Sequence, residues 1–470
     1  MKTVNRKIKK IIKNPKLFFS DMHLKYSFYL KKWNTTSHLE GKNNFSIVSA
    51  IYNMENHLPS FFQSITNQSL NFKKHISIIC IDDGSIDKSA HIIKEWQKKF
   101  PNNIKYIKKV NGGQATARNL GLLHAKTEWV TFIDPDDFIH KDYFRIIDCQ
   151  ISQYPDIQIA ISYLIFYMNS LKSFKDTHPL RFRFKKNTVI KNIHNLGEFI
   201  NLSASSSFFR NSVIQKKQIK FDDKVQPNFE DGKFIIDYLQ GCSCGTVAFI
   251  KQAKYFYRKS QIPTSTIDLS WKNPAKFLDI WLYAFLPILQ DAKFNPTLSH
   301  TIQSTVLYEI NNYINHLIDR NERIDFLSPQ QQETFLDLIK DAASFIDENV
   351  IWESILLSPK CKIIILEYFK NSKQPQPLAE ITKVNRKQQY LILSFYSGYK
   401  SDYAPFLSIS TKLTLLSREL IMHEFINSTV LYEHRFQIHL DSKLNKSNLK
   451  NLNIFINEIS ALVIHNYYNK

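Results

Sequence analysis

The sequence has little cysteine, no long hydrophobic run and too few acidic residues to balance its basic ones. Its five cysteines are scattered through 470 residues, at Cys80, Cys149, Cys242, Cys244 and Cys361. An odd, scattered set does not form a disulfide framework and suggests a reducing compartment. Cys242 and Cys244 form a C-x-C pair without a second pair of ligands, which argues against a metal site there.

Two other absences concern membranes and secretion. No apolar stretch reaches the roughly 20 residues that a helix needs to cross a bilayer. No secretory signal peptide opens the chain. Both absences favour a protein that works in the cytoplasm.

The shortage of acidic residues is concentrated in an N-terminal arm, residues 1–43. The chain carries a net charge of +20, and this arm contains 11 Lys or Arg and 2 acidic residues, so it contributes +9. Lysines alternate there with Ile, Leu, Phe and Trp, and a helix broken near Pro15 would have one basic and one apolar face. This pattern is typical of contact with an anionic membrane surface, through residues 1–35.

Two alternatives for the arm stay open. It can be a solvated segment that packs on the body of the protein, or it can bind nucleic acid. Nucleic-acid binding is disfavoured because the rest of the chain has no basic helix and no recognisable nucleic-acid module. We therefore expect no nucleic-acid partner, and a cytoplasmic, peripheral location on the inner face of the cytoplasmic membrane.

After residue 44, short apolar runs alternate with segments of helical spacing. The runs "FSIVSAIYN", "HISIICIDDGS", "IKYIKKV" and "WVTFIDPDD" are each followed by a segment such as "IDKSAHIIKEWQKKF" or "QATARNLGLLHA". This alternation predicts an α/β domain with a mostly parallel sheet covered on both faces. Ligands of such sheets bind beyond the carboxyl ends of the strands. Polar groups cluster at four such ends: Tyr52 and Asn53, Asp82 and Asp83, Asn111 to Gly113, and Asp134 to Asp137.

The stretch "FIDPDDF", residues 132–138, places three carboxylates directly after an apolar run. Carboxylates are hard oxygen ligands and suit Mg²⁺ or Mn²⁺ that keeps positions open for a substrate phosphate. Arg118, in the helix after "NGG", is placed to form charge-assisted bonds to the same phosphates. The alternative is an Asp-rich loop that caps the next helix, and the other three strand ends argue against it.

These motifs resemble those of family 2 inverting glycosyltransferases with the GT-A fold. The ordered set "VSAIYN", "IDDGSID", "NGGQATARN" and "FIDPDDF" continues with "FEDGKFI" and "YFYRKSQIPTST". The resemblance covers roughly residues 44–270 and is nearest to bacterial members that build capsules, teichoic acids and lipopolysaccharide. It implies a nucleotide-sugar donor, a divalent cation and a glycan or lipid-linked glycan acceptor.

The resemblance also assigns roles to single positions. Tyr52 matches the residue that packs on the base, Asp82 the one that bonds the base, and Asp136 the metal ligand. Ala50 is a departure, since relatives often carry Pro before this turn. The positions that match donor-nucleotide contacts are Ala50, Tyr52, Asp82, Asn111, Arg118 and Asp134.

A second carboxylate pair, Glu230 and Asp231, follows further along. An inverting transfer needs a base that takes the proton of the acceptor hydroxyl. By resemblance that base is Asp231, and Glu230 helps to hold the acceptor. The alternative is that the pair only starts a helix, where acidic residues favour the dipole. Arg258 and Lys259 are candidates for closing over the diphosphate, with ordinary surface charge as their alternative.

From about residue 271 the pattern changes. Residues 271–372 read as amphipathic helices, 373–382 as a linker, and 383–470 as a small β-sandwich with period-two alternation. His423, His434 and His439 lie there without metal-like partners, so we interpret them as structural or exposed. The helical and sandwich regions are candidates for a homo-oligomer interface.

We therefore predict a metal-dependent inverting glycosyltransferase that extends a cell-surface glycan. A UDP-sugar is the expected donor, because the base pocket resembles uracil sites. One alternative is a degenerate transferase kept as a glycan-binding or assembly module, against which intact Asp82, Asp136 and Asp231 argue. The other is a nucleotidylyltransferase, but "SAIYNMENHLP" is not the Gly-rich phosphate loop that such an enzyme needs.

Overall fold

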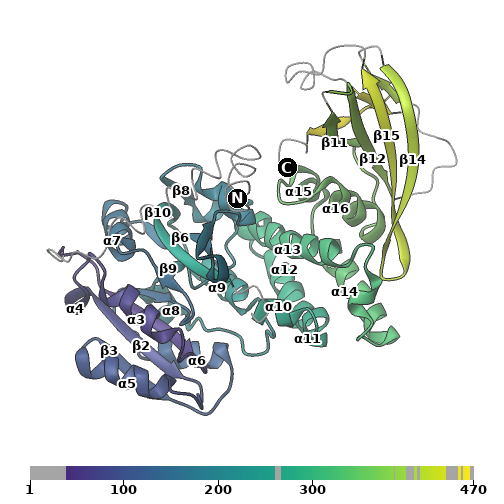
Figure 1. The fold of residues 1–470 in the computed structure, drawn as a ribbon. Helices are drawn as coiled ribbons and strands as arrows, with labels where there is room; N and C mark the ends of the chain where they lie inside the picture. Colours follow the sequence, from purple (N-terminus) through teal and green to yellow (C-terminus); the bar gives the residue numbers. More distant parts are fainter. Residues whose placement is uncertain are drawn as a thin grey trace, which may run out of the picture. The chain divides into compact units, whose positions relative to one another are not determined.

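The computed structural model describes residues 39–259, 266–385, 387–398, 407–409, 413–440, 454–456 and 459–465. Nearly all of the predicted N-terminal arm lies outside these ranges. The chain divides into two compact units (Figure 1): Met1–Ala284 with Asn295–Thr301, and Phe285–Phe294 with Ile302–Lys470. The domain limits expected from the sequence stay predictions.

The first unit is built on a ten-stranded sheet of order β3-β2-β1-β4-β9-β6-β10-β5, in which β7 pairs with β6 and β8 with β10. Strands β3, β2, β1 and β4 are mutually parallel, as predicted. Beyond β4 the sheet is mixed, because β9 runs antiparallel to both β4 and β6. The strands are β1 (Phe45–Ile51), β2 (Ile76–Asp82), β3 (Ile104–Lys108), β4 (Trp129–Phe132), β5 (Phe138–Ile139), β6 (Ile157–Met168), β7 (Ser173–Lys175), β8 (Thr188–Asn192), β9 (Ser207–Arg210) and β10 (Thr246–Lys259).

Helices cover both faces of this sheet (Figure 1), which confirms the predicted α/β fold. On one face a core of apolar side chains joins α3, α5 and α7 to the strands, and Phe62 of α3 stacks on Trp96 of α5. On the other face Phe234 of α9 packs against Phe132 and Phe209 of the sheet. The helices are α3 (Leu58–Thr66), α4 (Phe72–His75), α5 (Ser89–Lys99), α6 (Gln114–Leu122), α7 (Tyr143–Gln153), α8 (Asn211–Lys217), α9 (Glu230–Gly241), α10 (Thr266–Ser270) and α11 (Pro274–Phe277).

Helix α6 approaches strand β1 more closely than a side chain would allow. A Cβ at Gly121 would lie 2.3 Å from Cγ1 of Val48, far inside contact distance. Glycine at this point therefore lets the helix pack directly on the strand. This packing fixes the height of α6 above the sheet, and α6 carries Arg118.

The second unit contains helices followed by two β-sheets. One sheet has the order β14-β15-β12-β11-β18, and the other β13-β16-β17. Ile381 and Leu393 of the larger sheet share one apolar core with Ile454 and Ile456 of the smaller, so the predicted sandwich is confirmed. Strand β11 begins at Leu378, inside the range expected to be a linker. The strands are β11 (Leu378–Asn385), β12 (Tyr390–Ser397), β13 (Leu407–Ile409), β14 (Leu413–Phe425), β15 (Ser428–Leu440), β16 (Ile454–Ile456), β17 (Ile459–Ser460) and β18 (Leu462–His465).

Two of the helices between the first sheet and β11 are long, α13 and α14. Helix α14 starts at a capping box, in which Ser328 and Gln331 each bond the other's backbone amide. None of the helices in the described ranges is long and apolar enough to cross a bilayer. Besides α10 and α11, these helices are α12 (Leu286–Ala292), α13 (Pro296–Leu317), α14 (Pro329–Ser344), α15 (Glu348–Glu353) and α16 (Pro359–Ile363).

The histidines of the sandwich are part of its structure where side chains are described. His423 is buried and lies between two carboxylates, 2.7 Å from Oδ2 of Asp319 and 3.0 Å from Oε2 of Glu433. His434 is also buried. No group of three or more His, Cys, Asp or Glu residues that could hold a metal occurs in the described part of the chain.

The aromatic cluster under α9 gives a test of the fold. Phe234 is fully buried, and its ring stacks on that of Phe221 at 4.2 Å. Phe234→Ala should lower the free energy of unfolding by about 3–5 kcal/mol, because it removes buried apolar area and leaves a cavity. The measurement is urea unfolding followed by tryptophan fluorescence. Phe294→Ala is the matched control: its ring is 88% exposed, and we expect a change within about 0.5 kcal/mol. Equal losses in the two variants would contradict this packing.

Candidate active site

The predicted donor residues meet at one edge of the first sheet. Strands β1, β2, β3 and β4 run parallel, so their carboxyl ends point the same way. Tyr52, Asp82, Asn111 and Asp134 stand at or just after these four ends. The pairing of the strands therefore brings four separate motifs together at one polar edge of the sheet, which we call the mouth.

Tyr52 and Asp82 differ in how open they are to a ligand. The side chain of Tyr52 is 46% exposed, which leaves its ring face available for stacking. Asp82 is fully buried, and its two oxygens accept hydrogen bonds from the amide of Ser85 and the hydroxyl of Tyr106, each at 2.7 Å. These two bonds hold the loop after β2 in place. A carboxylate has further lone pairs, so Asp82 can still accept a hydrogen bond from a ligand. Ala50 is half-buried in β1, behind this loop.

Asp83 ties the loop after β2 to the glycine segment after β3. Its carboxylate accepts the amides of Gly112 at 3.0 Å and Gly113 at 2.8 Å, and it pairs with Nζ of Lys109 at 2.5 Å. Asn111 projects from this fastened segment as an exposed residue. Sequence reasoning gave Asp83 no role of its own, although it stands beside Asp82 in "IDDGS".

The three carboxylates of "FIDPDDF" do three different things. Asp137 is buried and accepts the hydroxyl of Tyr255 at 2.8 Å and the amide of Arg258 at 2.7 Å. Burial and the charges of Asp136 and Asp134 raise its pKa well above the usual range. Asp137 therefore stabilises the turn through hydrogen bonds on its buried side. Asp134 instead points toward α6, where its Oδ1 accepts the Arg118 guanidinium at 3.0 Å.

Asp136 is the carboxylate of this motif that is available to bind a cation. Burial, followed by the charge of Asp134, raises its pKa to about 6. It forms no ion pair with any residue in the described ranges. A partly buried carboxylate of this kind is stabilised by a cation. The chain offers a hard oxygen ligand here but not a full protein cage, and Mg²⁺ or Mn²⁺ commonly completes its shell with water and substrate phosphates. The residues present fit such an ion.

Arg258 is bonded to this turn, and Lys259 follows it in strand β10. Nε of Arg258 donates to the backbone oxygen of Asp136 at 2.6 Å, and a terminal nitrogen donates to Ser60 Oγ at 3.1 Å. The guanidinium also lies 5.1 Å from the ring centre of Phe138. Nζ of Lys259 lies 4.2 Å from the ring centre of Phe166. The structure thus shows Arg258 supporting the D-P-D-D turn, and the phosphate role stays a prediction.

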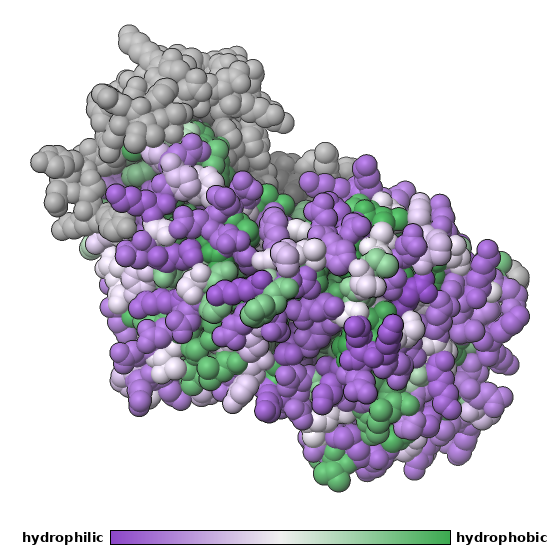
Figure 2. All heavy atoms as spheres, turned by 180° about the vertical axis from the view of Figure 1, so that it is seen from behind, coloured by the Kyte–Doolittle hydropathy of each residue, from purple (hydrophilic) through white to green (hydrophobic). Residues whose placement is uncertain are grey.

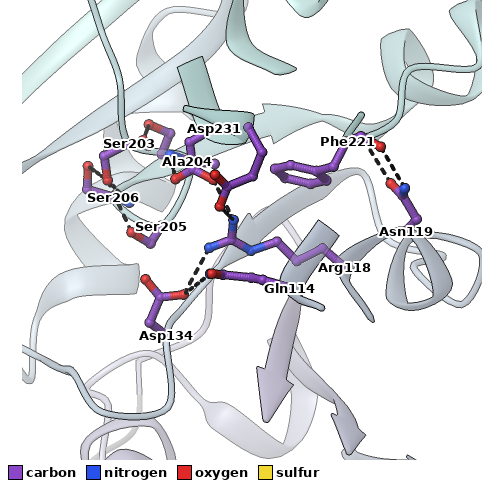
Figure 3. Close-up of polar contacts among 12 residues, drawn as sticks. Gln114, Arg118, Asn119, Asp134, Ser203, Ala204, Ser205, Ser206, Phe221 and Asp231 are labelled. Carbon is purple, nitrogen blue, oxygen red and sulfur yellow. Dashed lines mark hydrogen bonds and ion pairs between the residues drawn. The ribbon is translucent and has the colours of Figure 1, made fainter. Parts of the chain in front are cut away.

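Arg118 joins the donor end of the mouth to the second carboxylate pair (Figure 3). Its side chain is 2% exposed, and its guanidinium contacts three carboxylates: Asp134 at 3.0 Å, Glu230 at 3.4 Å and Asp231 at short range. The ring of Phe221 covers its face at 5.1 Å. The sequence placed Arg118 on donor phosphates, whereas the structure pairs it with the predicted base.

Glu230 and Asp231 begin helix α9, as both interpretations of "FEDGKFI" require. One oxygen of Asp231 contacts Arg118, and Oδ2 accepts the amide of Ala204 at 2.8 Å. Burial raises the pKa of Asp231, and Arg118 opposes that effect. The pKa of Glu230 rises to about 7, through burial and then the neighbouring Asp231. Burial therefore makes both carboxylates of the pair easier to protonate than free ones.

The loop that supplies the Ala204 amide was missed by sequence reasoning. Its serines form a local network, in which Ser203 Oγ lies 3.1 Å from the hydroxyls of both Ser205 and Ser206 (Figure 3). The only signal in the sequence is the run "SASSS", which reads equally well as a plain loop. Its closeness to Asp231 depends on a contact across 27 residues.

A separate hollow of about 620 Å³ opens along α9, beyond Asn119 and Phe221. The side-chain amide of Asn119 donates to the backbone oxygen of Phe221, and its oxygen accepts the amide of the same residue. The hollow is lined by both lysines and aspartates and contains none of the predicted site residues. The chemistry is therefore expected at the carboxylate mouth.

Comparison with known proteins gives this geometry a family. Residues 46–216 match the model described as Glycosyl transferase family 2. The minor teichoic acid biosynthesis protein GgaA of Bacillus subtilis is 31% identical over 314 residues, which cover 66% of this chain and 68% of that protein. The chain belongs to glycosyltransferase family 2. The resemblance seen in the sequence motifs is thereby confirmed, and the family match favours a glycosyltransferase over the nucleotidylyltransferase alternative.

Solved structures of the family agree on the fold. The crystal structure of S. aureus TarS is 14% identical, with a TM-score of 0.54 over 89% of this chain and 77% of that one. The TarS fragment 1–349 in complex with UDP-GlcNAc is 17% identical, with a TM-score of 0.53 over 70% of this chain and 87% of the fragment. At these identities the likeness concerns the family 2 fold, and it confirms the predicted GT-A architecture.

Replacement of Arg118, whose positive charge the three carboxylates share, tests this arrangement. Arg118→Ala leaves three partly buried carboxylates without their partner, so we expect a loss of about 3–5 kcal/mol in the free energy of unfolding at pH 8. In the variant the pKa values of Glu230 and Asp231 in the folded protein rise further above those in the unfolded chain, because Arg118 no longer lowers them. Stability then falls as pH rises through that window, so the loss should be smaller at pH 5.5.

Urea unfolding of wild type and variant at the two pH values measures this difference. The matched control is Arg145→Ala, which removes a more exposed ion pair to Asp142 at 3.5 Å. We expect the control to change stability by less than about 1 kcal/mol at either pH. A loss in Arg118→Ala that does not vary with pH would show that the carboxylates do not depend on this charge.

Proposed function

We propose that this family 2 member is an inverting glycosyltransferase that moves a sugar from a UDP-sugar to a teichoic acid-type polymer of the cell wall. The observation that carries the proposal is the arrangement at the mouth: Asp136, without an ion pair among the described residues, on the donor side and Asp231 beyond Arg118. The relatives support the substrate classes, since GgaA takes part in minor teichoic acid synthesis and TarS has been solved with UDP-GlcNAc.

On the donor side, the chain offers a stacking ring, buried hydrogen-bond acceptors and a carboxylate for a cation. Tyr52 would pack on the base and Asp82 would bond it, with Asn111 and Asp134 near the ribose and diphosphate. Asp136 would hold Mg²⁺ or Mn²⁺, which when bound neutralises negative charge on the diphosphate. The raised pKa of Asp136 supports this role, because a bound cation would stabilise the ionised form.

On the acceptor side, Asp231 would accept the proton of the attacking hydroxyl. As the acceptor oxygen forms its bond to the anomeric carbon, the bond from that carbon to the diphosphate oxygen breaks and UDP leaves with the electron pair. Attack from the face opposite the diphosphate inverts the anomeric centre. The Ala204 amide and Arg118 hold the Asp231 carboxylate in place, and Glu230 lies beside it to bind the acceptor.

The proposal places the enzyme at the inner face of the cytoplasmic membrane, where growing polymers on lipid carriers are found. The basic, aromatic-rich segment of residues 1–35 supports this placement through its sequence alone, because it lies outside the described residues. The acceptor would then be a lipid-linked glycan.

Asp136→Asn tests the metal role. The amide cannot neutralise a divalent cation, so UDP binding in the presence of Mn²⁺ should weaken by at least about tenfold, and EDTA should abolish transfer by the wild type. The measurement is calorimetric titration of UDP with Mn²⁺ and with EDTA. Asp156→Asn, at an exposed position before β6, serves as the control and should bind as the wild type does. Full transfer in EDTA would refute the role of Asp136.

Asp231→Asn and Glu230→Gln separate the two acceptor-side carboxylates. General-base catalysis contributes about 10²- to 10⁴-fold, so Asp231→Asn should bind UDP and metal normally yet transfer at least about a hundredfold more slowly. Glu230→Gln should keep most of the rate. Because it removes a negative charge beside Asp231, the acidic limb of its kcat/KM profile should move to lower pH.

The profiles of both variants are measured from pH 5 to 9 beside the wild type, whose rate should rise with pH as Glu230 and Asp231 lose their protons. A nearly active Asp231→Asn together with an inactive Glu230→Gln would make Glu230 the base. An unshifted acidic limb in Glu230→Gln would show that the two carboxylates titrate independently.

A further inference from the structure

A strongly basic segment lies between β6 and the base-holding serine loop. Residues 172–191 contain seven Lys or Arg and one acidic residue, Asp176. They form β7, a 3₁₀ helix at Pro179–Phe184 and most of β8. The family motifs assign no role to this segment.

Five of these cations have no acidic partner among the residues that the structure describes. Lys172, Arg181, Lys185 and Lys186 are exposed and Lys175 is half-buried. None of the five forms an ion pair within the described part of the chain. The carboxylate of Asp176 accepts the hydroxyl of Tyr163 at 2.6 Å, and Arg181 reaches only the backbone oxygen of Asp176. These five side chains are called the β7–β8 basic surface.

The register of the sheet places β7, and with it Lys175, near the end of the sheet that carries the D-P-D-D turn. Strand β7 pairs with the end of β6, β6 with the end of β10, and β10 with β5, which directly follows the D-P-D-D turn. Lys175 pairs with Phe166, which pairs with Tyr257 next to Arg258. Three strand spacings separate β7 from β5, a distance of about 14 Å. A ligand only a few units long can therefore reach both places.

A buried chain of hydrogen bonds connects the same segment to the base. Arg183, inside the 3₁₀ helix, donates to the backbone oxygen of Ile200 and to Oδ1 of Asn201. Asn201 in turn donates to Ser207 Oγ at 2.9 Å and to the backbone oxygen of Ser203 at 3.3 Å. The next residue, Ala204, holds Asp231. The segment that carries the basic surface and the loop that holds the predicted base are thus joined by hydrogen bonds through Arg183.

We propose that the β7–β8 basic surface binds the anionic phosphodiester backbone of the acceptor polymer and guides its hydroxyls toward Asp231. The inference rests on the proposed function and adds the acceptor's charge and the surface that recognises it. Exposed cations without acidic partners raise the local concentration of a polyanion and speed its arrival. The acceptor is thereby recognised along its backbone as well as at the reacting sugar or polyol.

The face of the molecule drawn in Figure 2 is mainly polar. In the view of Figure 2 hydrophilic residues dominate, and apolar residues occur in small separate groups. A neutral glycan would gain little from five cations, whereas the negative charges of a phosphodiester chain would be attracted to them. An anionic membrane is the competing partner, and the experiment distinguishes it.

The test compares two triple variants that change the net charge equally in the full-length protein. Arg181→Glu, Lys185→Glu and Lys186→Glu are combined in the first. Lys73→Glu, Lys126→Glu and Lys216→Glu, all at exposed positions elsewhere in the first unit, are combined in the control. Binding of purified wall teichoic acid, of neutral dextran and of vesicles containing phosphatidylglycerol is measured at low and high salt, beside transfer from UDP-sugars.

The first variant should bind teichoic acid at least about tenfold more weakly than the wild type at low salt, with a smaller difference at high salt. Its KM for the polymer should rise while its KM for the donor stays unchanged, and the control should match the wild type. Equal polymer binding by the two variants would overturn the proposal. Lost vesicle binding with intact polymer binding would assign the surface to the membrane instead. Failure of the wild type to transfer sugar would count against the proposed function, and polymer binding would still decide this inference.

Discussion

The ion pairs of one buried arginine connect the parts of the catalytic unit that the chain keeps far apart. Asp134 follows Arg118 by 16 residues, whereas Glu230 and Asp231 follow it by more than 110. A lone guanidinium would be very costly inside a protein, as would three carboxylates without a cation. Each side therefore requires the other, and the donor end of the mouth cannot be positioned independently of the acceptor end.

This dependence explains why the local surroundings of Arg118 are so closely packed. Phe132 and Phe221 lie against the guanidinium and exclude water from it. With less water around it, the guanidinium attracts the carboxylates more strongly. Because three carboxylates share this one positive charge, repulsion between them favours the protonated form of a carboxyl group that the charge does not neutralise. Burial is the main cause that raises the pKa of Glu230, and the charge of the neighbouring Asp231 adds to it.

Much of the mouth could be predicted from the sequence, because parallel strands bring their ends together and each end carries a recognisable motif. The division of labour within a motif could not be predicted. "FIDPDDF" does not reveal that Asp137, rather than Asp136, faces inward to Tyr255, since that contact depends on a strand 118 residues later. The serine loop and the mixed half of the sheet were missed for the same reason: antiparallel β9 and the Ala204 contact arise from long-range pairing, which no local period encodes.

The tight contact between Gly121 and Val48 has an evolutionary consequence. Because a methyl group at position 121 would overlap the valine, neither position is free to vary alone: a larger residue on the helix needs a smaller one on the strand. Among relatives, substitutions at these two sites are expected to appear as correlated pairs. Diversification of sugar and acceptor preference would then accumulate in the loops around the mouth, while this helix and its strand are inherited as one unit.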